Sequence, residues 1–351
     1  MKNRGLVDNC LQEKKSSPRG GIDNSDARSE IEALYSGVGI VDLTSRGKFE
    51  ISGPDACNFM NLRLAVNAPG INDVIDAPAL DRSGGVTAIW RTSQPAEGIF
   101  YLTGPGQYAQ RDFDSLRSEM SGSVRIINLT CDRDVLAIAG PLAAVVLTKI
   151  GWRGGNGSKQ LPSGADDGWI GEIPARLVLT VRGEVVIWEF HILKEDRSRL
   201  YELFLTAGAS FQITDIGTHM LASMRAKAGV PMIGLDIPFC AHPQDVGPPS
   251  WIHIDKPDFV GKSAYLARKL GIGSRLVRFM ISRSIAEPGW IVEGGNRLLV
   301  SDKSIGHVTS ASFTNDGDIF GFALVDPDTD PPNVCTVEIL GQAVEVCLIP
   351  L

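Results

Sequence analysis

The sequence predicts an α+β fold that ends in a small all-β domain. Between residues 30 and 272, apolar residues recur at helical spacing in some stretches and alternate in others. After Gly271-Ile272-Gly273 the helical pattern stops, and short strand-like runs separated by turn signals continue to the C-terminus. We therefore expect one mixed region over 30–272 and an all-β, barrel-like domain over 273–351.

Turn residues and apolar spacing divide the first part of the chain into elements. Residues 1–29 are polar and rich in glycine, serine and charge, so we expect a disordered arm there. The predicted helices lie near 31–38, after Asp55, after Pro105-Gly106, after Gly140-Pro141, and over 196–207 and 216–229. The predicted strands are 48–52, 77–80, 86–91, 99–103, 124–129, 134–139, 177–181 and 185–192. The last two form a hairpin around Arg182-Gly183-Glu184, and 152–168 is a glycine-rich loop.

The stretch from Met224 to Lys262 is the most irregular part of the sequence. Glycine and proline recur throughout it, so it cannot form regular structure. A loop of this length is functional or disordered, and its Trp251 and Phe239 favour an ordered, functional one. A short strand over 251–254 and a helix from Asp258 follow. The strands expected in the last domain are 276–281, 290–292, 298–300, 306–310, 320–325, 335–339 and 343–349.

Composition narrows the classes of partner and compartment. The net charge of −7 gives little support to a nucleic-acid partner. No apolar run is long enough to span a bilayer, so we expect no membrane partner. The six cysteines are scattered without the spacing of metal ligands, which indicates no metal site and a reducing, cytoplasmic setting. No pattern indicates an oligomeric state.

Glu189 is the residue that stands out, because it interrupts the apolar run VVIWEFHI. If Val185, Ile187, Glu189 and His191 share one strand face, the carboxylate needs a donor partner among apolar neighbours. The functional interpretation is a carboxylate that hydrogen-bonds an amidine- or guanidine-like ligand edge. The alternative is an edge strand with Glu189 in water. Asp245, in the proline-rich loop, is a second candidate, with a plain turn role as its alternative.

Eight motifs occur along the chain in a fixed order. They are GVGIVDLTSRGKFEISGPDACNFM, DVLAIAGPLAAVVL, MRAKAG, GLD, HPQDVG, DKPDFVGK, GHVTSASF and IFGFALV. Together they resemble the glycine-cleavage T-protein family, the tetrahydrofolate-dependent aminomethyltransferases, whose relatives include the folate-dependent demethylases and the folate domains of dimethylglycine and sarcosine dehydrogenases. The motifs span nearly the whole ordered chain. The resemblance implies a three-lobed aminomethyltransferase-like fold with a central folate cavity, in which 30–272 form two interleaved folate-binding lobes.

The resemblance also implies site residues. Glu189 matches the glutamate that holds the pteridine, although the spacing to the preceding turn is one residue longer and the usual tyrosine is absent. Asp245 stands at the glutamate of the family's Pro-x-Glu loop. From the residues themselves, and not from the resemblance, we add Arg225 in MRAKAG and the flat apolar side chains of Trp188 and Trp90 to the expected cofactor-binding set, with a plain core role as the alternative for the two tryptophans.

One departure decides which reaction we expect. After Gly84-Gly85 the aminomethyltransferases place acidic residues, one of them essential, where this sequence has Ala88 and Ile89. The nearest aspartate is Asp81, before the glycines. Closing a methylene bridge between N5 and N10 of folate benefits from a carboxylate near N10, whereas methyl transfer to N5 does not.

We therefore expect a tetrahydrofolate-dependent methyltransferase or demethylase that takes a methyl group from an O-, S- or N-methyl small molecule. The candidate acids for the leaving group are His253, His191 and Tyr35, with a purely structural role as the alternative for each histidine. The alternatives are a non-catalytic folate-binding protein, a member recruited to a folate-independent reaction, or residual aminomethyl or N-methyl oxidation chemistry that would require a separate flavin-bearing partner. The methyl donor is not identified by any pattern.

Overall fold

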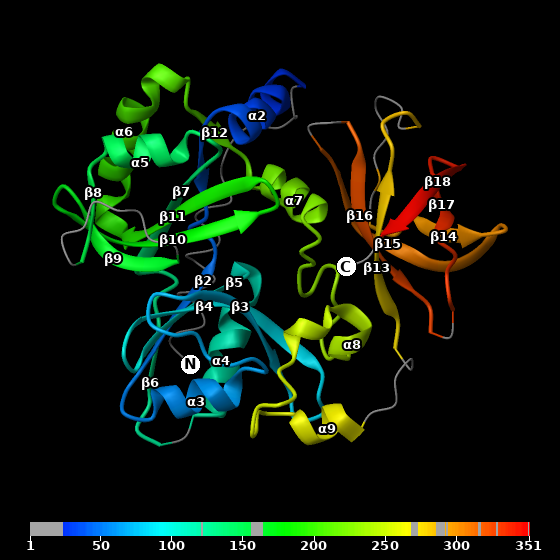
Figure 1. The fold of residues 1–351 in the computed structure, drawn as a ribbon, viewed down its shortest axis with the longest axis horizontal. Helices are drawn as coiled ribbons and strands as arrows, with labels where there is room; N and C mark the ends of the chain where they lie inside the picture. The colour runs from blue at the N-terminus through cyan, green and yellow to red at the C-terminus, as the bar shows by residue number, and fades with distance from the viewer. Residues whose placement is uncertain are drawn as a thin grey trace. The chain divides into compact units, whose positions relative to one another are not determined.

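A computed structural model describes residues 24–120, 122–155, 164–267, 273–285, 292, 294–314, 317–327, 329–349 and 351 (Figure 1). Contacts divide the chain into two compact units. Unit 1 comprises Met1–Asn61, Ala68–Ala77 and Trp90–Met220, and unit 2 comprises Leu62–Asn67, Pro78–Ile89 and Leu221–Leu351. The units do not follow the predicted division at residue 272. Unit 2 also includes residues 221–272 and two short segments of the first half of the chain, Leu62–Asn67 and Pro78–Ile89.

A seven-stranded sheet forms the larger layer of unit 1. Its strand order is β12-β1-β7-β11-β10-β9-β8. The strands are β1 (Gly39–Asp42), β7 (Arg133–Ala139), β8 (Trp152–Gly154), β9 (Ala165–Ile170), β10 (Ile173–Arg182), β11 (Val185–Leu193) and β12 (Thr214–Ile216). Only the β1–β12 pair is parallel. β11 therefore lies inside the sheet, with β10 on one side and β7 on the other.

Helices cover one face of this sheet. Trp188, Phe190 and Ile192 of β11 pack in one buried cluster with residues of α5 (Ala143–Lys149) and α6 (Arg197–Gly208). Phe190 and Phe204 meet edge to face at 5.1 Å between ring centroids. Because side chains alternate along a strand, the odd-numbered residues of β11 project from the opposite face. This alternation places Glu189 on the face that the helices leave uncovered.

A second sheet of five strands, in the order β3-β4-β5-β2-β6, belongs largely to unit 1. Its strands are β2 (Gly47–Ser52), β3 (Val74–Leu80), β4 (Val86–Ala96), β5 (Ile99–Gly104) and β6 (Arg125–Asn128), and its helices are α3 (Ala56–Arg63) and α4 (Ala109–Ser118). Phe49 of β2 stacks on Phe113 of α4 at 6.2 Å. Trp90 of β4 is fully buried, and its indole N–H donates to Asp112 of α4 at 2.9 Å.

Unit 2 holds the irregular segment and a closed barrel. The segment contains the end of α7 (Thr218–Lys227), then α8 (Pro243–Val246), the 3-10 turn η4 (Pro249–Trp251) and α9 (Lys262–Ala267). The barrel order is β13-β16-β15-β14-β17-β18. Its described strands are β13 (Arg275–Ile281), β14 (Arg297–Val300), β15 (Lys303–Phe313), β16 (Ile319–Val325), β17 (Val334–Ile339) and β18 (Gln342–Ile349). The prediction of a small all-β, barrel-like C-terminal domain is confirmed.

The structure corrects several predicted elements. Helix α2 (Asn24–Ser36) begins inside the predicted disordered arm, and the rest of that arm lies outside the described residues. The expected glycine-rich loop instead contains β8 and the start of β9. The expected strand at 251–254 is a 3-10 turn followed by irregular chain, because Pro248 and Pro249 fix a turn there. The predicted strand at 290–292 lies almost wholly outside the described residues.

A buried ion pair organises unit 2. The Asp236 carboxylate is fully buried and accepts hydrogen bonds from the Arg225 guanidinium, the Met232 backbone N–H at 2.8 Å and the Thr309 hydroxyl at 2.8 Å. Ser310 donates to the same carboxylate and accepts from Arg225. These contacts join α7 and the loop after it to strand β15 of the barrel.

We expect Asp236→Ala to lower the free energy of unfolding by about 3–5 kcal/mol, because it leaves the Arg225 charge without its buried partner. Urea denaturation of the purified chain measures this. Asp330→Ala is the matched control, since Asp330 pairs with Arg275 at 3.2 Å but has a side chain that is 97% exposed. It should change stability by less than about 1 kcal/mol. Equal effects of the two substitutions would contradict the assignment.

Candidate functional site

Glu189 is a fully buried carboxylate in the middle of a sheet. The strand register places Glu189 opposite Ala137 of β7 and Val178 of β10, so β11 is not an edge strand. The side chain has no exposed area. The prediction that Val185, Ile187, Glu189 and His191 share a face is confirmed, and the alternative of an edge strand with Glu189 in water is wrong.

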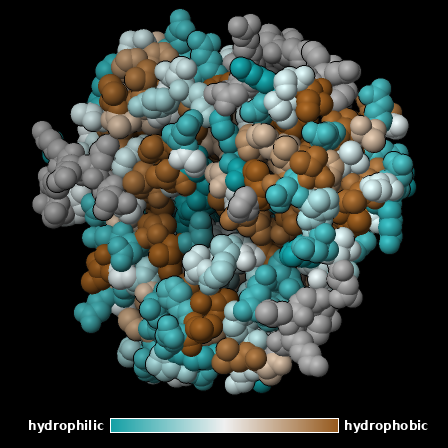
Figure 2. Space-filling view, turned by 45° about the vertical axis from the view of Figure 1, so that its right-hand side comes forward, coloured by the Kyte–Doolittle hydropathy of each residue, from teal (hydrophilic) through white to brown (hydrophobic). Residues whose placement is uncertain are grey.

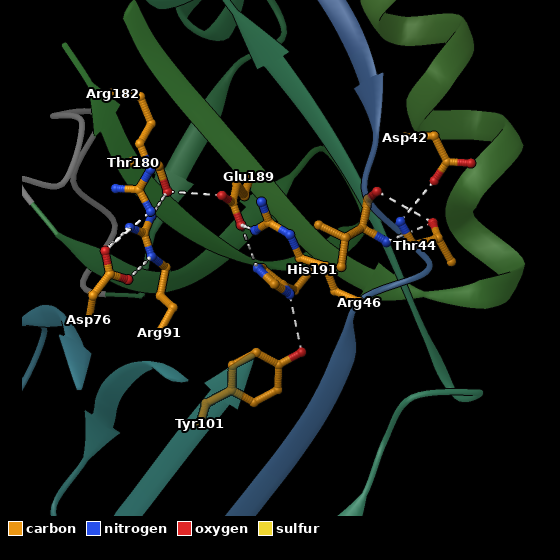
Figure 3. Close-up of polar contacts among 11 residues, drawn as sticks. Asp42, Thr44, Arg46, Asp76, Arg91, Tyr101, Thr180, Arg182, Glu189 and His191 are labelled. Atoms are coloured by element: carbon orange, nitrogen blue, oxygen red, sulfur yellow. Dashed lines mark hydrogen bonds and ion pairs between the residues drawn. The ribbon is translucent and has the colours of Figure 1, made fainter. Parts of the chain in front are cut away.

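Two donors hold the carboxylate (Figure 3). The Thr180 hydroxyl, on β10, donates to Oε1 at 2.9 Å, and the Arg46 guanidinium, from the turn before β2, donates to Oε2 at 2.6 Å. His191 lies on the same strand face, with Nε2 3.7 Å from Oε2. Burial alone would raise the pKa of Glu189, but the charges of Arg46 and Arg91 and the contact with His191 hold that pKa well below its ordinary value. Glu189 is therefore ionised in the folded protein.

A second carboxylate, that of Asp76, is linked to Glu189 through Arg91 and Thr180. Asp76 of β3 accepts two hydrogen bonds from Arg91 of β4, both at 3.0 Å, and one from Arg182 at 3.2 Å. Arg91 in turn donates to the Thr180 hydroxyl, which donates to Glu189. Burial would raise the pKa of Asp76, yet Arg91 and Arg182 lower it. The chain Asp76–Arg91–Thr180–Glu189 links the two sheets of unit 1 (Figure 3).

His191 is a neutral imidazole between Glu189 and Tyr101. Its Nδ1 lies 3.1 Å from the Tyr101 hydroxyl, and the two rings meet edge to face at 5.2 Å. Burial lowers the pKa of His191, and this outweighs the opposing pull of Glu189. Burial likewise raises the pKa of Tyr101. At neutral pH both groups are uncharged and able to relay a proton to or from a neighbouring atom.

The structure brings together two of the predicted residues in unit 1 and separates the others from them. His191 lies beside Glu189, as described above. Trp188 lies on the opposite face of β11, in the helix-covered core, because adjacent strand residues alternate in direction. Trp90 packs towards α4 through Asp112. Tyr35 is half-buried on α2. Trp188 and Trp90 therefore do not lie at the Glu189 face, and the structure shows them in the core role that was their alternative.

The remaining predicted residues belong to unit 2. Arg225 is engaged by Asp236, Ser310 and the Val230 carbonyl, which gives it a structural role. Asp245 is almost fully buried on the short helix α8. His253 is exposed, and its Nδ1 accepts the Asn67 backbone N–H at 3.2 Å. None of these contacts tests binding or catalysis, so Asp245 and His253 stay predictions.

Asp81 is engaged in the β3–β4 turn. Its Oδ1 accepts from the Ser83 backbone N–H at 2.8 Å, the Ser83 hydroxyl at 2.6 Å and the Gly85 N–H at 3.1 Å. A Cβ at Gly85 would lie 2.5 Å from the Cys240 carbonyl oxygen, so glycine is required there. Ala88, on the strand that follows, is buried. Asp81 therefore closes the turn and does not replace the acids of the family pattern.

Comparison with known proteins adds what the geometry alone does not give. A protein-family model described as "GCVT N-terminal domain" matches residues 22–256, which is more than half of the chain. The chain belongs to the GCVT family. The family model ends just before α9 and covers all of the Glu189 network.

The relatives of this family member are aminomethyltransferases and dimethylglycine dehydrogenases. A mitochondrial dimethylglycine dehydrogenase of Mus musculus is 29% identical over 301 residues, which cover 82% of this chain and 33% of that protein. The chain thus spans about a third of the length of the dehydrogenases that it matches. An aminomethyltransferase of Desulfitobacterium hafniense is 26% identical, with 92% of this chain and 88% of that protein covered.

A solved aminomethyltransferase structure has a similar fold. Glycine cleavage system aminomethyltransferase T from Bartonella henselae superposes with a TM-score of 0.76 at 22% identity, covering 92% of this chain and 88% of that chain. The predicted aminomethyltransferase-like α+β fold with its C-terminal barrel is confirmed. In this GCVT-family protein, no group of three or more His, Cys, Asp or Glu among the described residues could hold a metal ion. No helix in the same part of the chain is long and apolar enough to cross a membrane.

Sequence reasoning missed the residues of the network other than Glu189 and His191. Thr180 was within reach, because the hairpin register puts even-numbered β10 residues on the face of odd-numbered β11 residues. No local sequence pattern indicates that Asp76, Arg91 and Arg46 belong to the network. They come from β3, β4 and the turn before β2, and only the packing of the two sheets brings them to Glu189.

The depressed pKa of Glu189 predicts a specific pH dependence of stability. A carboxylate with a lowered folded pKa stabilises the fold above its unfolded value of about 4.5, and this contribution is lost as the pH falls below that value. Glu189→Gln should therefore lower the free energy of unfolding by about 3 kcal/mol at pH 7, and the difference from the unsubstituted protein should shrink below about pH 4.5. Urea denaturation across pH 3.5–7 measures it.

Glu172→Gln is the matched control for that series. Glu172 pairs with Arg199 at 3.0 Å, but its side chain is 86% exposed, so a change below about 1 kcal/mol is expected. A stability difference for Glu189→Gln that did not vary with pH would mean that Glu189 is not ionised in the folded protein.

Proposed function

We propose that this protein transfers a methyl group from an O-, S- or N-methyl small molecule to N5 of tetrahydrofolate. The observation that supports this most is the buried, ionised Glu189, which stands at the position that resembles the pteridine-holding glutamate of the family. Similar curated proteins are named as aminomethyltransferases and dimethylglycine dehydrogenases, and these names support chemistry at a one-carbon group for this chain. The cysteines among the described residues are free thiols, and we place the protein in the cytoplasm on that ground.

The residues at Glu189 fit a pterin. An ionised carboxylate has about four acceptor positions; Thr180 and Arg46 occupy one on each oxygen, and His191 Nε2 lies 3.7 Å from Oε2. The remaining acceptor capacity would suit the N–H groups along a pterin edge, and because the Glu189 side chain has no exposed area, side chains around it would have to move to admit the ligand. Arg46 and the Asp76–Arg91 ion pair keep the Glu189 carboxylate ionised and hold its orientation. The folate cavity that the family resemblance implies is part of this proposal.

Tetrahydrofolate would supply the nucleophilic N5, so that N5–H and CH₃–X give N5–CH₃ and H–X. The proton lost from nitrogen is the proton gained by the leaving group, and no oxidant or reductant is needed. His191 is neutral and buried beside Glu189, so it is the group of this network suited to move that proton. Apolar Ala88 and Ile89 in place of acids favour methyl transfer over methylene transfer, because nothing at these two positions assists N10.

One observation favours a second candidate, a folate-independent reaction. Arg46 already neutralises Glu189 within the protein, so the carboxylate does not need a ligand to be satisfied. Calorimetric titration of the full chain with tetrahydrofolate separates the candidates. Binding with turnover supports the proposal, binding without turnover indicates a folate-binding protein, and no binding indicates the folate-independent reaction.

We expect the purified protein, given tetrahydrofolate and methoxy, methylthio or N-methyl compounds, to form 5-methyltetrahydrofolate. Glu189→Gln should weaken tetrahydrofolate binding roughly 10- to 100-fold, because a hydrogen bond to a charged group contributes about 1.5–3 kcal/mol. Mass spectrometry of the folate product and calorimetry measure the two effects. Glu172→Gln again serves as the control and should leave both unchanged. Formation of methylenetetrahydrofolate alone would show that methyl transfer is wrong.

A further inference from the structure

The network around Glu189 carries more positive than negative charge. Three guanidinium groups, those of Arg46, Arg91 and Arg182, share two carboxylates, those of Asp76 and Glu189. His191 adds no charge at neutral pH, since burial lowers its pKa. The result is one unbalanced positive charge in a chain whose net charge is −7. A local surplus of positive charge is not expected from the composition, because the chain as a whole is negatively charged.

The surplus is concentrated on two arginines. Each guanidinium nitrogen of Arg91 makes a hydrogen bond, because Nε and Nη2 donate to Asp76 and Nη1 donates to Thr180. Arg46, by contrast, donates one side-chain hydrogen bond among the described residues, from Nη1 to Glu189, and 29% of its side chain is exposed. Arg182 shares Asp76 with Arg91 at the longer distance of 3.2 Å, and 23% of its side chain is exposed.

The lowered pKa of Arg182 also indicates that its positive charge is not fully compensated. Burial and then repulsion from Arg91 lower the pKa of Arg182, despite the attraction of Asp76 and Glu189. Arg176, the other arginine on this face of β10, is held by Asp167 at 2.7 and 2.9 Å and so adds nothing to the surplus. Figure 3 shows Arg46 and Arg182 extending from different elements towards the Thr180–Glu189 pair.

We propose that Arg46 and Arg182 bind a carboxylate of the ligand. A planar guanidinium matches a carboxylate through paired N–H donors, and a single negative charge balances the surplus of one. This inference rests on the proposed function only for the identity of the ligand. The carboxylate is assigned to the methyl donor, because the glutamate tail of folate lies at the far end of the molecule from the pterin edge that Glu189 would hold, and Arg46 is bonded to Glu189; the second arm of the experiment checks this assignment.

Binding is measured by calorimetry on the full chain, first without folate. The probes are methoxyacetate and 3-(methylthio)propionate, each paired with its neutral amide. The expected result is that a carboxylate binds at least tenfold more tightly than its amide, and that Arg46→Gln and Arg182→Gln each remove most of this preference. Arg199→Gln is the control, because Arg199 is an arginine of unit 1 whose side chain is 53% exposed on α6. It should leave the preference unchanged.

The second arm compares tetrahydrofolate with 6-methyltetrahydropterin, which lacks the tail. If Arg46→Gln or Arg182→Gln weakens binding of the former alone, the carboxylate is that of the folate. Arg182→Gln leaves the Glu189 ion pair in place, so it tests the proposal even if Arg46→Gln disturbs folding. Equal binding of acids and amides, or no binding of either, together with unchanged tetrahydrofolate affinity in both variants, would overturn the inference. Carboxylate selectivity without formation of 5-methyltetrahydrofolate would instead refute the proposed function and leave this inference standing.

Discussion

The burial of one negative charge, on Glu189, constrains most of unit 1. A carboxylate removed from water is stable only with donors around it, and no donor of the required kind is available from its sheet neighbours Ala137 and Val178. The donors come from Thr180 on β10 and from Arg46 in the turn before β2. Their positions in turn require that the second sheet pack where it does. The ion pair thus couples the geometry of the two sheets to one buried side chain.

Unit 2 contains a second buried acid with a different use. Asp236 also pairs with an arginine, but Arg225 is only 12% exposed, and its two terminal nitrogens also donate to Val230 and Ser310. Its Nε is buried without a hydrogen-bond partner among the described residues, so a ligand could not reach it. Arg46 is more than twice as exposed. The contrast in exposure, and not the presence of an ion pair, is what separates a candidate ligand contact from a structural link.

Local pattern was enough to predict the hairpin of β10 and β11, the buried strand β7 and the barrel strands, because their apolar periodicity and turns lie within a few residues of one another. The face of Glu189 followed from strand alternation alone. Trp188 and Trp90 were misplaced because an aromatic residue gives no sign of which face its strand will bury. The partners Arg46, Asp76 and Arg91 could not be predicted, since their meeting depends on the packing of two sheets, which no local pattern encodes.

Two independent features of the chain favour the same reaction. Transfer of an aminomethyl or methylene unit passes through cationic carbon, which a site with surplus positive charge disfavours and which acids such as those of the family pattern would stabilise. Three arginines meet two carboxylates, Glu189 included, in the network of unit 1. Methyl transfer places developing negative charge on the leaving oxygen or sulfur, and guanidinium groups stabilise such charge. On the proposed function, this arginine surplus suits an anionic leaving group better than a cationic one-carbon unit, and the apolar residues Ala88 and Ile89 in the sequence favour the same reaction.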